Sequence, residues 1–173
     1  NFLDSAYACI EVISPCINDS TFIFEDGGLA SSYSSSYSNA HIYLEGIFYV
    51  DLNMSFENCI IKTKAGSSIV LLDNYILNFF NTTISGCDTM WQGLIVDYNG
   101  TVILEDLNSI QDAHEAINLG PKGNLLMNNS EIINSVTGVK VPPTYPSLFA
   151  GSVDLREARF GRYASSFLPD YHG

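Results

Sequence analysis

The chain has 173 residues, of which 46% are hydrophobic and only 15% are charged. Seven Lys and Arg against nineteen Asp and Glu give a net charge of −12, and such a field repels phosphate backbones and acidic glycans, which disfavours nucleic acid and polyuronates as partners. No apolar run is long enough to span a bilayer, and no basic stretch followed by an apolar run indicates a signal peptide. We expect a single domain, and we interpret the chain, which begins at Asn1 without Met, as a mature or excised segment.

The first forty residues do not repeat elsewhere in the chain. Their pattern predicts a strand at 21–25, a turn at 26–28 and a polar loop rich in Ser and Tyr at 31–39. We expect residues 1–40 to cap a solenoid, because an open solenoid end presents unpaired backbone groups that recruit other chains. Residues 41–173 then form its coils, which we expect to continue beyond Gly173.

Segments after residue 40 match one another at a spacing of about 22 residues. Residues 110–117 match residues 132–139 at an offset of 22, and residues 102–104 match residues 125–127 at an offset of 23. Periods of this length indicate stacked units that each bury an apolar face on a neighbour. Short bursts of Ile, Val, Leu and Phe, broken by Asn, Gly, Asp and Ser, predict strands and turns rather than helices. The sequence therefore predicts an all-β fold, a parallel β-helix.

The repeats predict particular stacked positions. One interior apolar column should contain Ile61, Ile84, Ile110, Ile132 and Phe160. Burial of each side chain should contribute roughly 1.5 to 3 kcal/mol. Asn also recurs near one turn, where it tolerates a left-handed backbone and can form an amide ladder. The asparagines concerned are Asn58, Asn81, Asn108 and Asn129.

The four cysteines indicate in which cellular compartment the protein is found. Cys9 and Cys16 enclose a short loop, and Cys59 and Cys87 are one coil and a few residues apart. We therefore predict disulfides between Cys9 and Cys16 and between Cys59 and Cys87, and with them an extracytoplasmic location. Reduced buried thiols are the alternative. Zinc is disfavoured, since there is no CxxC pair and the three histidines show no ligand spacing.

One stretch resembles a known group of proteins. Residues 84–96 contain Cys87, the pair Met90-Trp91 and Gly93, and an Asp-Ala-x-x-Ala-Ile pattern follows at 112–117. This arrangement resembles the right-handed parallel β-helix repeats of large exported surface proteins of gliding and related bacteria, which are similar in fold to the pectin-lyase-like superfamily. The resemblance covers roughly residues 41–141. It implies a right-handed β-helix, a cell-surface location and type IX export, but no activity, because one fold hosts lyases, hydrolases, tailspikes and adhesins.

The densest acidic group is the candidate for catalysis. It contains Asp106, Asp112 and Glu115. Glycoside hydrolysis uses two carboxylates about 5 to 10 Å apart, but the repeat partner of Asp112 is Asn134, an amide. We therefore interpret these acids as solvated turn residues. The alternative is that they bind or hydrolyse a neutral glycan.

Two aromatic residues are candidates for ligand contact. Trp91 could stack on a sugar ring, although core packing is its commoner role, and Tyr98 suits contact with a glycan or a protein. No metal or cofactor is predicted. The preferred hypothesis is a non-enzymatic structural or adhesive module of a larger extracellular bacterial surface protein. Its expected partners are a surface protein assembly or a glycan, with end-to-end stacking at an open C-terminal coil.

Overall fold

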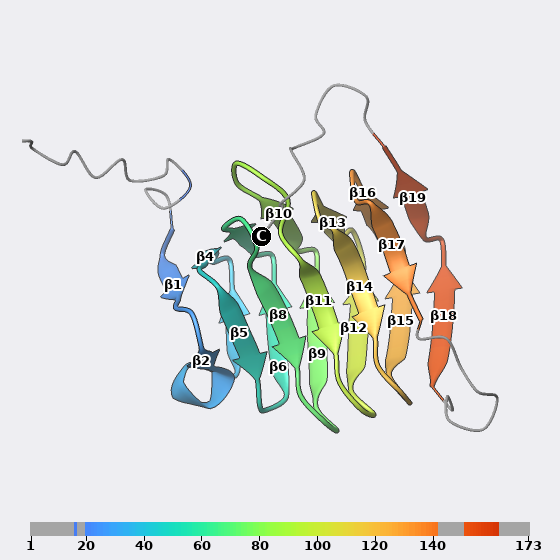
Figure 1. Ribbon diagram of the computed structural model, residues 1–173, viewed down its shortest axis with the longest axis horizontal. Coiled ribbons are helices and arrows are strands. Elements are labelled where there is room, and N and C mark those ends of the chain that lie inside the picture. The colour runs from blue at the N-terminus through green and yellow to red at the C-terminus, as the bar shows by residue number, and fades with distance from the viewer. Residues whose placement is uncertain (1–15, 17–19, 142–150, 163–173) are drawn as a thin grey trace, which may run out of the picture.

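The computed structural model describes residue 16, residues 20–141 and residues 151–162. These residues form a parallel β-solenoid, in which three parallel sheets run along the long axis of the molecule (Figure 1). Each coil of the chain adds one strand to sheet A, one to sheet B and one to sheet C. The prediction of an all-β fold with parallel, stacked coils is confirmed.

The strands are short, and their bounds are as follows. Sheet A contains β1 (Phe22–Phe24), β4 (His41–Leu44), β7 (Ile60–Thr63), β10 (Thr83–Gly86), β13 (Ser109–Gln111), β16 (Glu131–Ile133) and β19 (Arg159–Gly161). Sheet B contains β2 (Gly28–Leu29), β5 (Ile47–Val50), β8 (Ser68–Leu71), β11 (Gly93–Val96), β14 (Glu115–Leu119) and β17 (Thr137–Lys140). Sheet C contains β3 (Ser36–Ser38), β6 (Met54–Glu57), β9 (Ile76–Phe80), β12 (Thr101–Glu105), β15 (Asn124–Asn128) and β18 (Ser152–Arg156). A 3-10 turn, η1 (Ala30–Ser32), follows β2.

Strand pairing follows the sequence repeat. Residues 109–111 pair with residues 131–133, and residues 101–105 pair with residues 124–128, at the predicted offsets. Residues 124–128 pair in turn with residues 152–156, so the longer spacing of the last copy is taken up between β17 and β18. The register predicted for coils after residue 41 is therefore confirmed.

The predicted interior column is present in sheet A. Its members, in order along the solenoid, are Ile42, Ile61, Ile84, Ile110, Ile132 and Phe160. The five isoleucines are at most 2% exposed. Phe160 was expected to be buried but is 51% exposed, because it lies in the last strand that the structure describes in this sheet. Phe22, at the other end of the column, is 42% exposed for the same reason.

The solenoid begins one coil earlier than predicted. We expected a cap over residues 1–40, but β1, β2 and β3 pair in parallel with β4, β5 and β6. The ring of Phe24 stacks on that of Phe48 with 4.3 Å between centroids, so this coil shares the same core. Residues 20–40 are thus a true first coil. Residues 1–15 and 17–19 lie outside the described residues.

Buried polar side chains form a column at the corner between sheets C and A. Thr82 Oγ1 donates to the carbonyl of Phe80 at 3.0 Å, and Ser130 Oγ donates to that of Asn128 at 2.8 Å. These bonds bring a buried hydroxyl to carbonyls at the ends of the sheet C strands, and the carbonyl of Phe80 also accepts from the backbone N–H of Asn58 at 3.0 Å. By register the column contains Ala40, Cys59, Thr82, Asn108, Ser130 and Ala158.

Asn108 is the most extensively bonded member of this corner column. It is 1% exposed, and its Nδ2 donates to the carbonyls of Glu105 at 2.8 Å and Phe79 at 3.1 Å. Its Oδ1 accepts from the backbone N–H of Thr82 at 2.9 Å. One amide therefore joins two coils and fills the corner between them.

The predicted ladder of turn asparagines is present without Asn108. Asn58, Asn81 and Asn129 have left-handed backbones with φ between 43° and 52°, and Asn81 Nδ2 donates to Asn58 Oδ1 at 2.7 Å. In the fourth coil the turn has one more residue, and Asp106 and Leu107 both have left-handed backbones with φ 51°. Placing Asn108 in this ladder was wrong, because it points into the core.

The predicted cysteine pairing is also wrong. The structure joins Cys16 to Cys87, with 6.2 Å between their Cα atoms. Cys59 is a buried free thiol in the corner column, and its Sγ lies 3.3 Å from the carbonyl of Glu57. Cys9 lies outside the described residues. The disulfide ties the chain just before the first coil to the turn after β10, which is in the fourth coil.

Replacing Asn108 tests the corner column. Asn108→Ala should lower the free energy of unfolding by about 2 to 4 kcal/mol, since each buried polar group left without a partner costs about 1 to 3 kcal/mol. Urea unfolding followed by circular dichroism measures it. Asn128→Ala, on the outer side of β15, is the control and should change stability by no more than about 0.5 kcal/mol. Equal effects of the two changes would contradict the role given to Asn108.

Removing the Cys16–Cys87 disulfide tests the link between the first and fourth coils. The bond closes a loop over a sequence separation of 71 residues. The double change Cys16→Ser and Cys87→Ser should therefore lower the free energy of unfolding by about 4 kcal/mol, through the gain in entropy of the unfolded chain. Cys59→Ser is the control and should change stability much less, because Thr82 and Ser130 show that the same column accepts a hydroxyl. A linked peptide containing Cys59 in a non-reduced digest would refute this pairing.

Candidate functional site

The structure does not bring the three candidate catalytic acids together. Asp106 lies in the turn before β13, with a left-handed backbone, and Asp112 lies in the turn after it. The two carboxylates therefore lie at the two ends of β13, in different corners of the coil. Glu115 begins β14, where its Oε2 accepts from Asn118 Nδ2 at 2.8 Å and its Oε1 pairs with Lys140 Nζ at 2.5 Å. Glu115 is thus engaged in links within sheet B and with the next coil.

Asp112 is buried rather than solvated. It is 7% exposed, and its Oδ1 has no hydrogen-bond partner among the described residues. Burial raises the pKa of this carboxyl above its ordinary value, while the hydrogen bond from Asn134 and the charge of Lys62 act in the opposite direction. The expectation of a solvated turn was wrong for Asp112. Its neighbour by register is an amide, so the aligned carboxylate pair of a glycosidase is missing at this corner.

The two aromatic candidates have different positions. Trp91 is fully buried, and its Nε1 donates to the carbonyl of Gln111 at 2.9 Å, so it cannot stack on a ligand. Tyr98 is 44% exposed in the turn between β11 and β12, and Lys122 Nζ lies 4.9 Å from the centre of its ring. Trp91 is therefore a core residue. Tyr98 remains accessible at the edge between sheets B and C.

The outer face of sheet B carries an apolar surface that the sequence analysis did not single out. One outward row follows the axis of the solenoid through four successive coils, in the order Leu29, Tyr49, Val70 and Ile95. Ile47 lies beside it on β5 and is 38% exposed. We call these five residues the sheet B stripe. With coils about 4.8 Å apart, the row is about 14 Å long.

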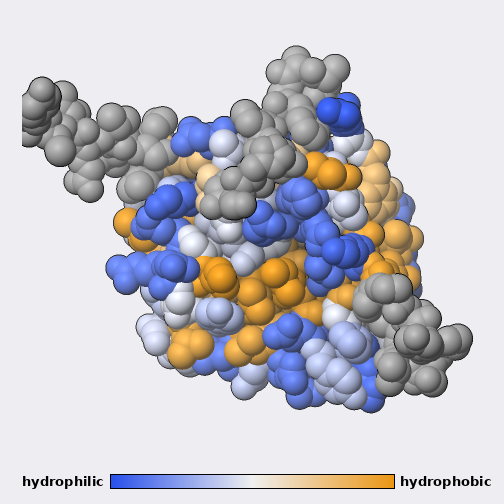
Figure 2. Space-filling view, viewed as in Figure 1, coloured by the Kyte–Doolittle hydropathy of each residue, from blue (hydrophilic) through white to orange (hydrophobic). Residues whose placement is uncertain are grey.

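Figure 2 shows this face, with apolar residues across the middle and hydrophilic residues above and below. In the next two coils the same outward position is polar, because Asn118 pairs with Ile95 and Lys140 pairs with Asn118. The corresponding outer row of sheet C is mixed: Ser36, Ser55, Asn78, Ile103, Leu126 and Asp154. The stripe therefore ends after Ile95, and the matching outer row of sheet C is not apolar over four successive coils.

Two apolar runs in the sequence could have indicated the stripe. A half-buried strand alternates apolar and polar residues, whereas Ile47–Val50 and the residues Leu94, Ile95 and Val96 are apolar throughout. Such runs indicate apolar side chains on both sides of a sheet. Only the register shows which of them point outward and that they lie in one row.

The described residues contain no candidate metal centre and no membrane-spanning helix. No group of three or more His, Cys, Asp or Glu side chains is placed to hold a metal ion in residues 20–141 and 151–162. In the same part of the chain no helix is long and apolar enough to cross a membrane. Comparison with protein-family models, with curated proteins and with solved structures finds no match. The sheet B stripe is thus the strongest candidate site.

The raised pKa of Asp112 predicts a pH-dependent effect of Asp112→Asn. A carboxyl whose pKa is higher in the folded state than in the unfolded state destabilises the fold once pH rises through that window. The variant should therefore be more stable than the wild type at pH 7, since Asn can still accept from Asn134. The difference should shrink as pH falls below the ordinary pKa of 3.8. Thermal unfolding at pH 3 and pH 7 measures this, and lower stability of the variant at pH 7 would contradict it.

Proposed function

We propose that this protein is a non-enzymatic binding module of an extracellular or cell-surface protein, with the sheet B stripe as its contact surface. The observation that supports this proposal most is the row of outward apolar side chains on sheet B, where β5, β8 and β11 each pair with a strand on both sides and β2 pairs with β5. Contiguous apolar surface with a polar surround is typical of protein interaction sites. A rigid face also loses little conformational entropy on binding.

Two observations support an extracellular location. The Cys16–Cys87 disulfide favours an oxidising compartment, since structural disulfides are rare where thiols are kept reduced. The resemblance of residues 84–96 to exported surface proteins of gliding bacteria points the same way. A pectin-lyase-like relationship and type IX export are part of this proposal and rest on that resemblance alone.

A structural role in a larger assembly fits the end of the described solenoid. Val153, Leu155 and Phe160 continue interior columns but are 39%, 43% and 51% exposed. A further coil stacked on this end of the described residues would bury them and pair with β17, β18 and β19. Stacking at this end is therefore included in the proposed scaffolding role.

Binding through the stripe is tested by matched double variants. Val70→Thr with Ile95→Thr removes two apolar side chains from paired strands of sheet B and keeps β-branched residues in place. Ile103→Thr with Leu126→Thr makes the same kind of change on paired strands of sheet C and is the control. On an array of peptides that vary in apolar and charged content, the first variant should lose at least about tenfold in affinity, or about 1.4 kcal/mol. The control should bind as the wild type does.

Catalytic activity on a glycan would contradict the proposed non-enzymatic role. Incubation with neutral polysaccharides should release no reducing sugar above a buffer blank. Release that Asp112→Asn abolishes would overturn the proposal in favour of a glycan-cleaving enzyme. Peptide binding that both double variants weaken equally would show that the stripe is not the contact surface.

A further inference from the structure

The edges of the sheet B stripe are strongly acidic. In coils one to four, seven carboxylates lie in the turns that enter and leave sheet B, and Lys64 is the one Lys or Arg in those turns. Lys64 already forms an ion pair with Glu45. The carboxylates are Glu25, Asp26, Glu45, Asp51, Asp73, Asp88 and Asp97. The apolar row therefore runs between two negatively charged edges.

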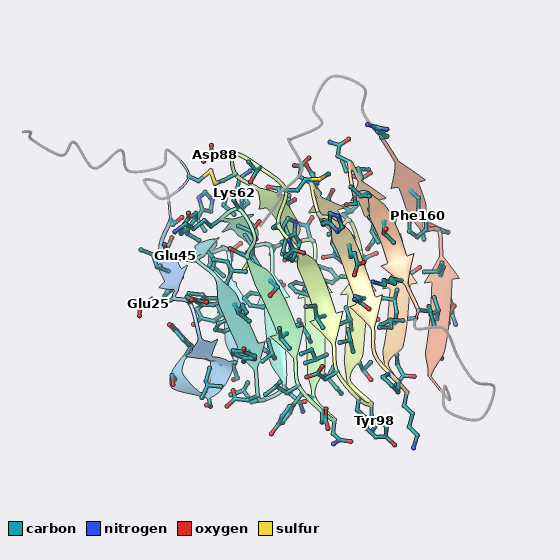
Figure 3. All side chains as sticks on the ribbon, viewed as in Figure 1. Glu25, Glu45, Lys62, Asp88, Tyr98 and Phe160 are labelled. Atoms are coloured by element: carbon teal, nitrogen blue, oxygen red, sulfur yellow. A yellow bond between two sulfur atoms is a disulfide. The ribbon has the colours of Figure 1, made fainter. Side chains whose placement is uncertain are left out.

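The edge toward sheet A contains a hollow that adjoins the stripe. It has a volume of about 570 Å³, and Glu25, Asp26, Glu45 and Lys64 line it together with Ile47, which belongs to the stripe. Figure 3 shows Glu25 and Glu45 near one another at the end of the molecule where the chain enters the solenoid. A long cationic side chain could place its stem on Ile47 and its charge among these carboxylates.

The edge toward sheet C also lacks cations until the stripe ends. Asp97 follows β11 and Asp73 precedes it by one coil, and both burial and the charge of Asp73 raise the pKa of Asp97. The first cation along this edge is Lys122, over the ring of Tyr98, one coil beyond Ile95. A cationic partner would relieve the repulsion between these two aspartates, which follow the strands that carry Val70 and Ile95.

We infer that the sheet B stripe binds a cationic polypeptide segment, whose apolar side chains cover the stripe and whose Lys or Arg side chains reach the acidic edges. This inference rests on the proposed function and names its partner class. Anionic lipids and nucleic acids are repelled by the same edges. A neutral glycan fits less well, because Tyr49 carries the one side-chain hydroxyl in the stripe, whereas Leu29, Val70 and Ile95 offer no hydrogen bonds to sugar hydroxyls.

Three soluble peptides with the same apolar residues test the inference, with intervening positions that are mainly Lys, mainly Ser or mainly Glu. Fluorescence anisotropy should show the Lys peptide binding at least about tenfold tighter than the Ser peptide, which corresponds to about 1.4 kcal/mol. The Glu peptide should not bind. Binding of the Lys peptide should weaken with salt as the Debye length falls from about 10 Å at 0.1 M to about 3 Å at 1 M.

Charge variants locate the effect. Asp73→Asn with Asp97→Asn removes two charges beside the stripe, and Glu57→Gln with Glu105→Gln removes two from the outer side of sheet C as the control. The first pair should weaken binding of the Lys peptide at least about fivefold, or about 1 kcal/mol. The control pair should have little effect, although both variants have the same net charge.

The outcomes distinguish two statements: that the partner is cationic, and that the sheet B stripe is a binding surface. If the Ser peptide binds as tightly as the Lys peptide and both depend on Val70 and Ile95, the stripe is a binding surface but its partner is not cationic. If no peptide depends on Val70 and Ile95, both statements fail. Equal losses in the two charge variants would overturn the inference by showing attraction to net charge alone, and stripe-dependent binding to a neutral glycan array would replace it.

Discussion

The structure depends on the backbone ladder that joins each coil to the next at a spacing of about 4.8 Å. This ladder fixes the position of every side chain relative to its equivalent one coil away, so each column must be compatible along its whole length. Interior columns are therefore filled mainly by Ile, Leu, Val, Phe and Met. At the corner between sheets C and A, the buried side chains of Thr82, Asn108 and Ser130 donate hydrogen bonds to backbone carbonyls.

Much of the fold could be predicted because the repeat spacing reports this ladder directly. Three errors have different causes. Residues 20–40 were predicted as a cap and not as a coil, because β2 has only two residues and a Ser-rich loop follows it. The coil from β7 to β10 repeats at 23 residues, so Cys59 lies in register with Thr82 and not with Cys87. An inserted residue before β13 moved Asn108 from the turn into the core.

The surface was harder to predict than the core, because exposure depends on which of two adjacent apolar residues faces outward. The acidic group of the sequence separates once the chain is folded, since Asp106 and Asp112 lie at opposite ends of β13. The sheet B stripe forms in the opposite way, from residues about 20 to 25 apart that the coils bring into one row. Acids that are scattered in the sequence become the two edges of that row for the same reason.

The measurement that tests this account most directly is the mapping of backbone amide chemical shifts during titration with the Lys-rich peptide. Because the site is one face of a rigid solenoid, the perturbed amides should be those of Leu29, Tyr49, Val70 and Ile95 and of the turns that flank them. Amides of the outer row of sheet C, such as those of Ser55, Ile103 and Leu126, should not shift. Perturbations centred on sheet C, or spread evenly over all three sheets, would contradict a single binding face on sheet B.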